Sequence, residues 1–195
     1  MQLTAAAFLD ALHAEADDAE RDKKKRYLHT GPDTQVIGVR MGTLFATAKA
    51  YHRMPLDQVE QLLASPYYEA RMGAVSILDF QARHPRITDA ERRALYDTYL
   101  NNHDRIDNWD LVDRAAPRVI GWYLLDKPRD ILYDLAASPD QWRRRTAITA
   151  TLFLIRNHQY DDARKLADLL ADDPAPLVRK SVAIARRELG KADTP

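Results

Sequence analysis

Trp109 and Asp113 are the residues whose types and spacing point most directly to chemistry. They lie four residues apart in "NNHDRIDNWDLVDRAAP" (residues 101–117), and therefore share a face if this segment is helical. Arg105 and Arg114 are close in sequence, and positive charge nearby favours an ionised carboxylate. An ionised Asp113 could stabilise a cation, activate water or hold an arginine, and the Trp109 ring could face a cation. The pair predicts a site for positive charge, with a core aromatic and an arginine-paired helix acid as the alternatives.

Asp113 also interrupts an internal repeat. Three segments begin with a capping residue followed by proline: Ser65, Ser138 and Asp173. Each has an arginine six residues after the cap: Arg71, Arg144 and Arg179. The caps are separated by 73 and 35 residues, so a fourth copy is expected near 102–108. "DNWDLVDRAAP" from Asp107 fits, and it has Asp113 where the other copies have arginine.

The elements that carry these residues are predicted to be helices throughout. Only 6 of 195 residues are glycine, and apolar residues recur at spacings of three and four. Thr4 and Thr88 are further candidate helix caps. Shorter helices are expected between the repeat copies, over residues 54–64, 89–100, 128–137 and 159–171. The period predicts an all-α fold, a HEAT-like or ARM-type α-solenoid of five to six antiparallel helix pairs.

Length and composition restrict the classes of protein. A chain of 195 residues is expected to form a single domain, residues 1–195. The longest uncharged stretch, residues 146–155, is too short to span a bilayer, and the N-terminus does not resemble a secretory signal. Without cysteine there is no thiolate ligand or disulfide, and the 6 histidines lack ligand-like spacing. A cytoplasmic monomer without metal or cofactor is expected.

The basic residues predict a polyanion partner even though the formal net charge is zero, from 29 basic and 29 acidic residues. In a solenoid the second helices of the pairs line one concave groove, where guanidinium groups can bind phosphate. The residues expected to bind the phosphate groups of such a partner there are Lys24, Arg71, Arg144, Arg145, Arg179 and Lys180. The alternative for each arginine is pairing with an aspartate of the next repeat, and for each charge run a solvated helix surface.

Three segments carry a resemblance to a known family. They are "RIDNWDLVD" (105–113), "SPDQWRRRTAI" (138–148) and "RYLHTGPDTQVIGVRMGTLFATAKAY" (26–51). With them the chain resembles the DNA alkylation repair glycosylases of the AlkD-like family, which have a HEAT-like repeat fold. The resemblance extends from Tyr27 to about Lys191. It implies excision of cationic N3- or N7-alkylated purines from duplex DNA, without extrusion of the base into a pocket.

The resemblance also implies roles for single residues. Asp113 would be the catalytic carboxylate, Trp109 one wall of the sugar site, Arg145 a phosphate or active-site contact, and Tyr27 a residue near the lesion. Family members usually carry a second tryptophan in the last matched helix, where this chain has Ile184 and Ala185. They also continue with a further helical pair, which this chain is expected to lack. A noncatalytic DNA-binding protein and a protein-interaction scaffold therefore remain alternatives to a glycosylase.

Overall fold

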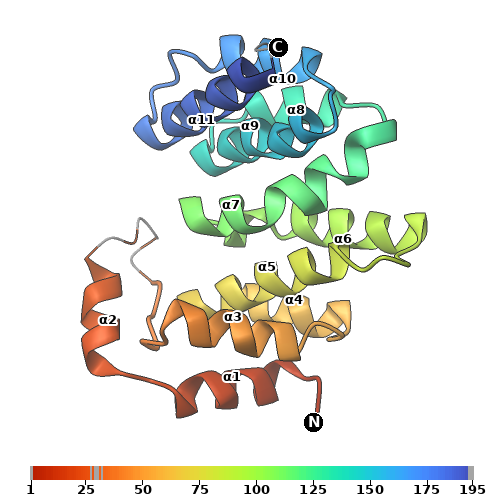
Figure 1. The fold of residues 1–195 in the computed structure, drawn as a ribbon. Coiled ribbons are helices and arrows are strands. Elements are labelled where there is room, and N and C mark those ends of the chain that lie inside the picture. The colour runs from red at the N-terminus through yellow and green to blue at the C-terminus, as the bar shows by residue number, and fades with distance from the viewer. Residues whose placement is uncertain (1, 27, 29–30, 32, 193–195) are drawn as a thin grey trace. The chain divides into compact units, whose positions relative to one another are not determined.

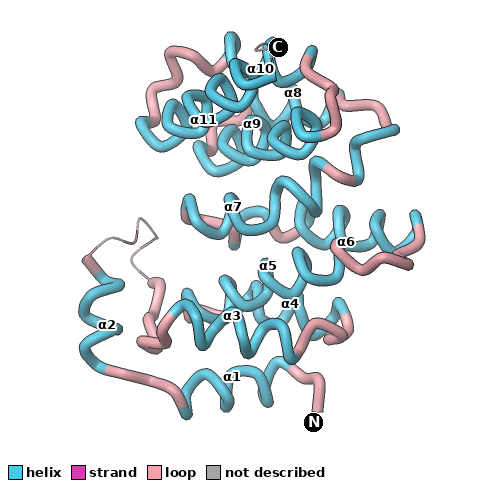
Figure 2. Tube along the Cα trace, viewed as in Figure 1, coloured by secondary structure: helices cyan, strands magenta, loops and turns pink. Residues whose placement is uncertain are grey.

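The computed structural model describes residues 2–26, 28, 31 and 33–192, and these are helical or in connecting loops (Figures 1 and 2). The helices are α1 (Ala5–Ala14), α2 (Asp18–Lys25), α3 (Met41–Ala50), α4 (Leu56–Ala64), α5 (Tyr68–Ala82), α6 (Asp89–Asn101), α7 (Trp109–Ala116), α8 (Asp130–Ala136), α9 (Gln141–Arg156), α10 (Asp161–Leu169) and α11 (Pro176–Ala192). Short helical turns η1 (His103–Arg105), η2 (Pro117–Gly121) and η3 (Tyr123–Asp126) flank α7. No strand occurs among the described residues, which confirms the all-α prediction.

The chain divides into two compact units, Met1–Leu111 and Val112–Pro195, with the boundary inside α7. In the first unit α5 is the central helix and packs against α1, α3, α4 and α6. Twelve consecutive residues of α5, from 68 to 79, are buried. In the second unit α9 is central and packs against α8, α10, α11 and η2. Each unit therefore has its own core, and the single domain over residues 1–195 stays a prediction.

The helices within each unit follow the predicted repeat. The four expected shorter helices are α4, α6, α8 and α10, each within a few residues of its predicted bounds. The longer helices α5, α9 and α11 each follow one of them in the chain, and α4 packs on α5, α8 on α9 and α10 on α11. These contacts fit the expected helix pairs, because each pair buries its apolar faces against its neighbours. The α-solenoid itself stays a prediction.

Two of the predicted caps are confirmed. The Thr4 hydroxyl accepts a hydrogen bond from the Ala7 N–H at 3.2 Å and caps α1. Thr88 and Glu91 form a reciprocal capping box at the start of α6, in which the Glu91 carboxylate accepts from the Thr88 N–H at 2.7 Å. Both caps satisfy N–H groups that the first helical turn leaves without a partner.

The three proline-containing repeat starts need a correction. Their first residues are not helix caps; each side-chain oxygen instead accepts from the N–H two residues later, and the helix begins three residues after it. The pairs are Ser65 with Tyr67, Ser138 with Asp140, and Asp173 with Ala175. Serine and aspartate readily form such local turns, and proline fits the middle position because it has no N–H to lose. The three segments therefore share a local structure, in which this turn comes directly before the helix.

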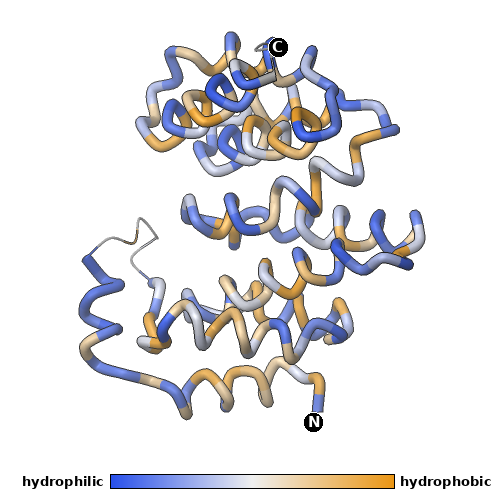
Figure 3. The backbone as a smooth tube through the Cα atoms, in the orientation of Figure 1, coloured by the Kyte–Doolittle hydropathy of each residue, from blue (hydrophilic) through white to orange (hydrophobic). Residues whose placement is uncertain are grey.

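A buried acid holds the segment before α3 against α5. The Glu69 carboxylate accepts from the backbone N–H groups of Ile37, Gly38 and Val39 at 2.9 to 3.3 Å. It also pairs with the Lys24 ammonium of α2 at 3.1 Å. Gly38 has φ +97°, a conformation that favours glycine. Figure 3 shows that α2 is a polar helix. The buried pair of Lys24 with Glu69 holds this helix against α5.

Replacing Gly73 tests the contact between α1 and α5. A methyl group on Gly73 would overlap the ring of Phe8, which is fully buried, whereas nothing lies within 4 Å of the corresponding position on Gly42 in α3. We expect Gly73→Ala to lower the free energy of unfolding by about 1–3 kcal/mol, as overpacked cores do. Gly42→Ala should be neutral or stabilising by up to about 1 kcal/mol. Urea denaturation of both variants measures the difference, and equal effects would contradict the close α1–α5 packing.

Candidate functional site

Asp113 of α7 lies in a two-point ion pair with Arg145 of α9. The Arg145 Nε donates to Asp113 Oδ1 at 3.0 Å, and Nη2 donates to Oδ2 at 2.7 Å. Its remaining Nη1 donates to the backbone carbonyl of Leu177 in α11. The guanidinium therefore joins the C-terminal half of α7 to α9 and α11, and the planar fork fixes the orientation of the carboxylate.

The carboxylate is the accessible member of this pair. The Asp113 side chain is 33% exposed, whereas that of Arg145 is 4% exposed. Asp113 lines a small cavity of about 90 Å³ together with Thr149, Leu152, Ser181 and Ile184. A carboxylate has about four lone-pair positions, and Arg145 occupies two, so the others can accept from water or meet a cation in this cavity. Arg145 is placed to hold Asp113 and is too buried to lie along a DNA backbone.

The other residues of the cavity were not identified from the sequence. Thr149 and Leu152 follow Arg145 in α9 by four and seven residues, and Ser181 and Ile184 follow Leu177 in α11 by the same intervals. Residues at these spacings share a helix face. Because Arg145 is a candidate from the sequence, the residues four and seven positions after it on the same helix face, Thr149 and Leu152, could also have been predicted. Ile184 lines the cavity, whereas Ala185 is fully buried in the core.

The start of α7, where Trp109 lies, is fixed by partly buried polar contacts of the first unit. The Tyr68 hydroxyl donates to Asp110 Oδ2 at 2.6 Å, and the Asn108 amide donates to Oδ1 at 2.6 Å. Burial raises the pKa of Asp110 above its ordinary value, and the hydrogen bonds from Tyr68 and Asn108 offset this only partly. The residues on both sides of Trp109 are thus held together, and the half-buried Trp109 is one turn before Asp113 in the same helix.

The repeat arginines form the predicted alternative contacts. Arg144 pairs with Asp173, the first residue of the next copy, at 2.6 Å, and Arg71 lies 3.2 Å from Asp107, which begins the copy after it. Burial lowers the pKa of Arg71 and raises that of Asp107, while their mutual attraction opposes both shifts. These arginines therefore connect consecutive copies of the repeat.

Arg144 and Arg179 also match in their backbone contacts. Each donates through Nη1 to the carbonyls of the residues six and five positions before it. This supports the predicted equivalence of these two positions. Arg71 departs from the pattern, because Arg105 donates to the Ser65 carbonyl at 3.1 Å while Arg71 donates to the Thr34 hydroxyl at 3.0 Å.

Burial corrects the predicted DNA contact of Lys24, as it does that of Arg145. Lys24 is 1% exposed, and its ammonium donates to the Val39 carbonyl as well as pairing with Glu69. Such a buried amine cannot bind a phosphate on the surface, so the prediction that Lys24 contacts DNA is wrong. Arg179 and Lys180 of α11 are exposed. Tyr27 lies outside the described residues.

Neither a metal site nor a membrane helix is found in the described part of the chain. No three His, Cys, Asp or Glu side chains among the described residues gather as metal ligands would. None of the helices described combines the length and apolar character needed to cross a membrane.

Comparison with known proteins gives one family. The sequence model of a family described as DNA alkylation repair enzyme matches residues 8–195 of this chain. No curated protein matches the chain significantly. The family match covers both the Asp113–Arg145 pair and the start of α7.

Removing one hydroxyl tests how the start of α7 is held. Tyr68→Phe deletes the donor to Asp110, and we expect it to lower the free energy of unfolding by about 1.5–3 kcal/mol at neutral pH. The hydrogen bond lowers the Asp110 pKa in the folded state. Its loss should therefore cost most where Asp110 is ionised and progressively less as the pH falls and the carboxyl is protonated.

The neighbouring tyrosine supplies the control. Tyr67 is half-buried, and its hydroxyl has no hydrogen-bond partner among the described residues, so Tyr67→Phe should change stability by less than about 0.5 kcal/mol. Urea denaturation over a pH series compares the two variants. A Tyr68→Phe penalty independent of pH would contradict the assigned contact with Asp110.

Proposed function

Because the chain belongs to the DNA alkylation repair enzyme family, we propose that it is a DNA glycosylase acting on cationic N3- or N7-alkylated purines in duplex DNA. The family gives a role in alkylation repair. The observation that carries the finer proposal is the Asp113 carboxylate, which Arg145 orients, which lines a cavity, and whose side chain is 33% exposed.

The substrate chemistry suits a carboxylate without a general acid. An alkylated purine of this kind already carries positive charge, so its bond to the sugar can break without protonation of the base. The base leaves as a neutral molecule with the bonding electrons, and the sugar becomes oxocarbenium-like. Asp113 stabilises this cation, and water then forms the new bond to the anomeric carbon and loses its proton to the solvent. Unit charges about 4 Å apart interact by about 4 kcal/mol at an effective dielectric near 20.

The neighbouring residues have supporting roles in this proposal. Arg145 orients the carboxylate, and Trp109, one turn earlier on α7, offers an aromatic face to the sugar cation. The chain needs no cofactor for these steps and acts as a monomer. Because the base need not enter a pocket, the small volume of the Asp113 cavity is no obstacle.

Contacts with the DNA backbone come from exposed basic residues. Arg179 and Lys180 near the start of α11 are exposed and are proposed to bind phosphate. Arg71 and Arg144 have donors committed to Asp107 and Asp173, so they act mainly in holding the repeat together. Phosphate contacts position a protein on DNA without reading its sequence.

The residue at position 184 bears on the choice between a glycosylase and a noncatalytic binding protein. Ile184 lines the Asp113 cavity where an aromatic wall would enclose the sugar. An aliphatic side chain gives less stabilisation to a cation than an aromatic ring does, so a slow enzyme is expected. The alternative is a noncatalytic HEAT-like protein that binds DNA or another protein, in which the Asp113–Arg145 pair serves only to join helices.

The carboxylate is tested by a substitution that preserves its shape. Asp113→Asn should lower the rate of N7-methylguanine release from methylated duplex DNA by about two to three orders of magnitude, since charge stabilisation is lost in the transition state. Because Asp113→Asn no longer neutralises the buried Arg145, thermal melting first verifies that this variant is folded, and binding to the same DNA should then stay nearly constant. Trp109→Ala should cost less, about 1–2 kcal/mol of activation free energy.

Asp172→Asn is the matched control, because Asp172 is an exposed acid that does not line the cavity. It should leave the rate of release unchanged. Equal release by wild type and Asp113→Asn would remove the catalytic role of Asp113. If the wild type released no cationic adduct while binding duplex DNA, the noncatalytic alternative would replace the proposal.

Restoring the aromatic wall is a gain-of-function test. Ile184→Trp places an indole at the cavity of Asp113, and we expect up to about a tenfold faster release of N7-methylguanine from stacking or cation–π stabilisation of the sugar. Ala183→Trp is the control, because Ala183 is the preceding residue of α11 but is exposed and does not line the cavity. Single-turnover rates compare the two, and equal rates would show that Ile184 does not face the reacting sugar.

A further inference from the structure

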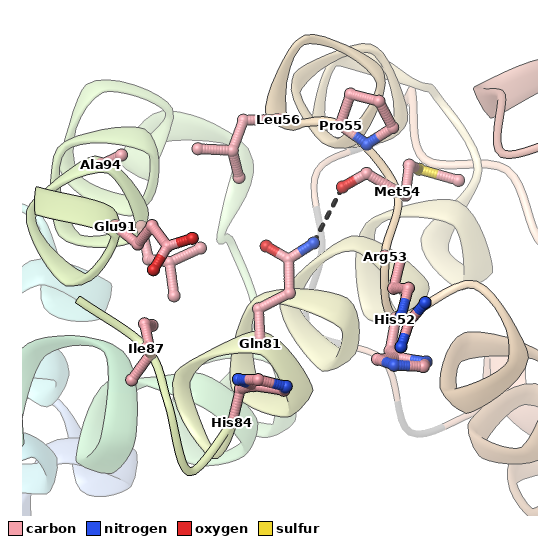
Figure 4. Close-up of a pocket in the computed structure, with 11 residues that line it drawn as sticks. His52, Arg53, Met54, Pro55, Leu56, Gln81, His84, Ile87, Glu91 and Ala94 are labelled. Atoms are coloured by element: carbon pink, nitrogen blue, oxygen red, sulfur yellow. Dashed lines mark hydrogen bonds between the residues drawn. The ribbon is translucent and has the colours of Figure 1, made fainter.

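A second cavity lies at the far end of α5 from Tyr68. It has a volume of about 350 Å³, within the range of small-ligand sites. Its walls come from the α3–α4 connection, the end of α5 and the start of α6 (Figure 4). Gln81 is thirteen residues beyond Tyr68 on α5, so the cavity is about 20 Å from the Tyr68–Asp110 contact. It is therefore separate from the start of α7.

Two acceptor oxygens in this cavity are fixed before any ligand arrives. The Gln81 amide donates to the Met54 carbonyl at 2.8 Å, which leaves its Oε1 without a donor among the described residues. The Glu91 Oε2 accepts from the N–H and hydroxyl of Thr88 at 2.7 and 2.8 Å, and no described residue donates to Oε1. Because other contacts hold these side chains, a ligand with N–H donors would lose little freedom in binding them.

Donors are found on the opposite side. Figure 4 shows His52 and Arg53 together on one side of Gln81, His84 below Gln81, and Glu91, Ile87 and Ala94 on the other side. Arg53 is exposed and has no ion-pair partner among the described residues. The His84 Nδ1 accepts from the Arg86 N–H at 3.3 Å, so a neutral His84 carries its proton on Nε2 and can donate.

We propose that this cavity binds a small apolar zwitterion, of which a free aliphatic amino acid is the simplest example. Its ammonium group is complementary to Glu91 and Gln81, and its carboxylate to Arg53 and His84. Its side chain is complementary to the apolar wall of Leu56, Ile87, Ala94 and Leu95. The opposite charges of Glu91 and Arg53 favour a ligand with both charges over a simple anion or cation. This inference does not depend on the glycosylase proposal.

Ligand derivatives test the proposal on the unaltered protein. Calorimetric titration with leucine should give saturable binding in the millimolar range. Leucinamide, which lacks the carboxylate, and N-acetylleucine, which lacks the ammonium group, should each bind about tenfold more weakly. Equal binding of leucine and N-acetylleucine would show a carboxylate site only and overturn the zwitterion, and so would the absence of saturable binding of leucine.

Matched variants assign the two charges. Glu91→Gln keeps the capping box, which accepts either residue, and should weaken leucine about tenfold without affecting N-acetylleucine. Arg53→Gln should weaken leucine about tenfold without affecting leucinamide. Arg93→Gln is the control, because Arg93 of α6 pairs with Asp97 and does not line the cavity, and it should leave all three affinities unchanged. Thermal melting verifies folding, and variants that bind leucine as the wild type does would overturn the assignment.

Discussion

The second unit depends on one arginine whose side chain is almost fully shielded from solvent. Arg145 is almost fully enclosed, and its guanidinium is satisfied by the Asp113 carboxylate and the Leu177 carbonyl, so α7, α9 and α11 meet at this side chain. Removal of one member of a buried ion pair leaves an uncompensated charge, which is costly. The same constraint has a chemical consequence: the carboxylate that neutralises Arg145 is held rigidly, and its exposed edge borders the cavity of Thr149, Ser181 and Ile184. Structural need and candidate chemistry therefore coincide at Asp113.

Local patterns allowed much of the fold to be predicted. Apolar spacing placed α4, α6, α8 and α10 within a few residues, and Thr88 with Glu91 marked the start of α6. The repeat register also predicted that an arginine could meet the aspartate of the next copy, as Arg144 meets Asp173. The helix starts after Ser65 and Ser138 were placed too early, because a serine before proline suits both a helix cap and the local turn found here. Only the backbone geometry distinguishes the two.

The candidate site was less accessible to sequence reasoning, because its contacts join distant residues. Asp113 and Arg145 were identified by motif and resemblance, but their direct pairing spans 32 positions. Lys24 was misread for the same reason: a run of lysines and an arginine normally indicates exposed charge, and the partner that buries Lys24 is Glu69 on another helix. Likewise, the cavity lined by Gln81, Glu91 and Arg53 lies between the α3–α4 and α5–α6 connections, which share no sequence motif. Burial of a charge is a property of its tertiary partners, and no local pattern encodes it.

The central claim is that Asp113 assists the departure of a base that is already charged. The most direct measurement compares single-turnover release of N7-methylguanine and of hypoxanthine from otherwise identical duplexes by the wild-type protein. Hypoxanthine is a neutral purine and needs a proton to leave easily, and a carboxylate whose two oxygens accept from Arg145 is not placed to supply it. The acceleration for each base is its catalysed rate divided by its uncatalysed rate. The account predicts an acceleration for N7-methylguanine that is about a hundredfold or more larger than that for hypoxanthine. Equal accelerations for the two bases would contradict it.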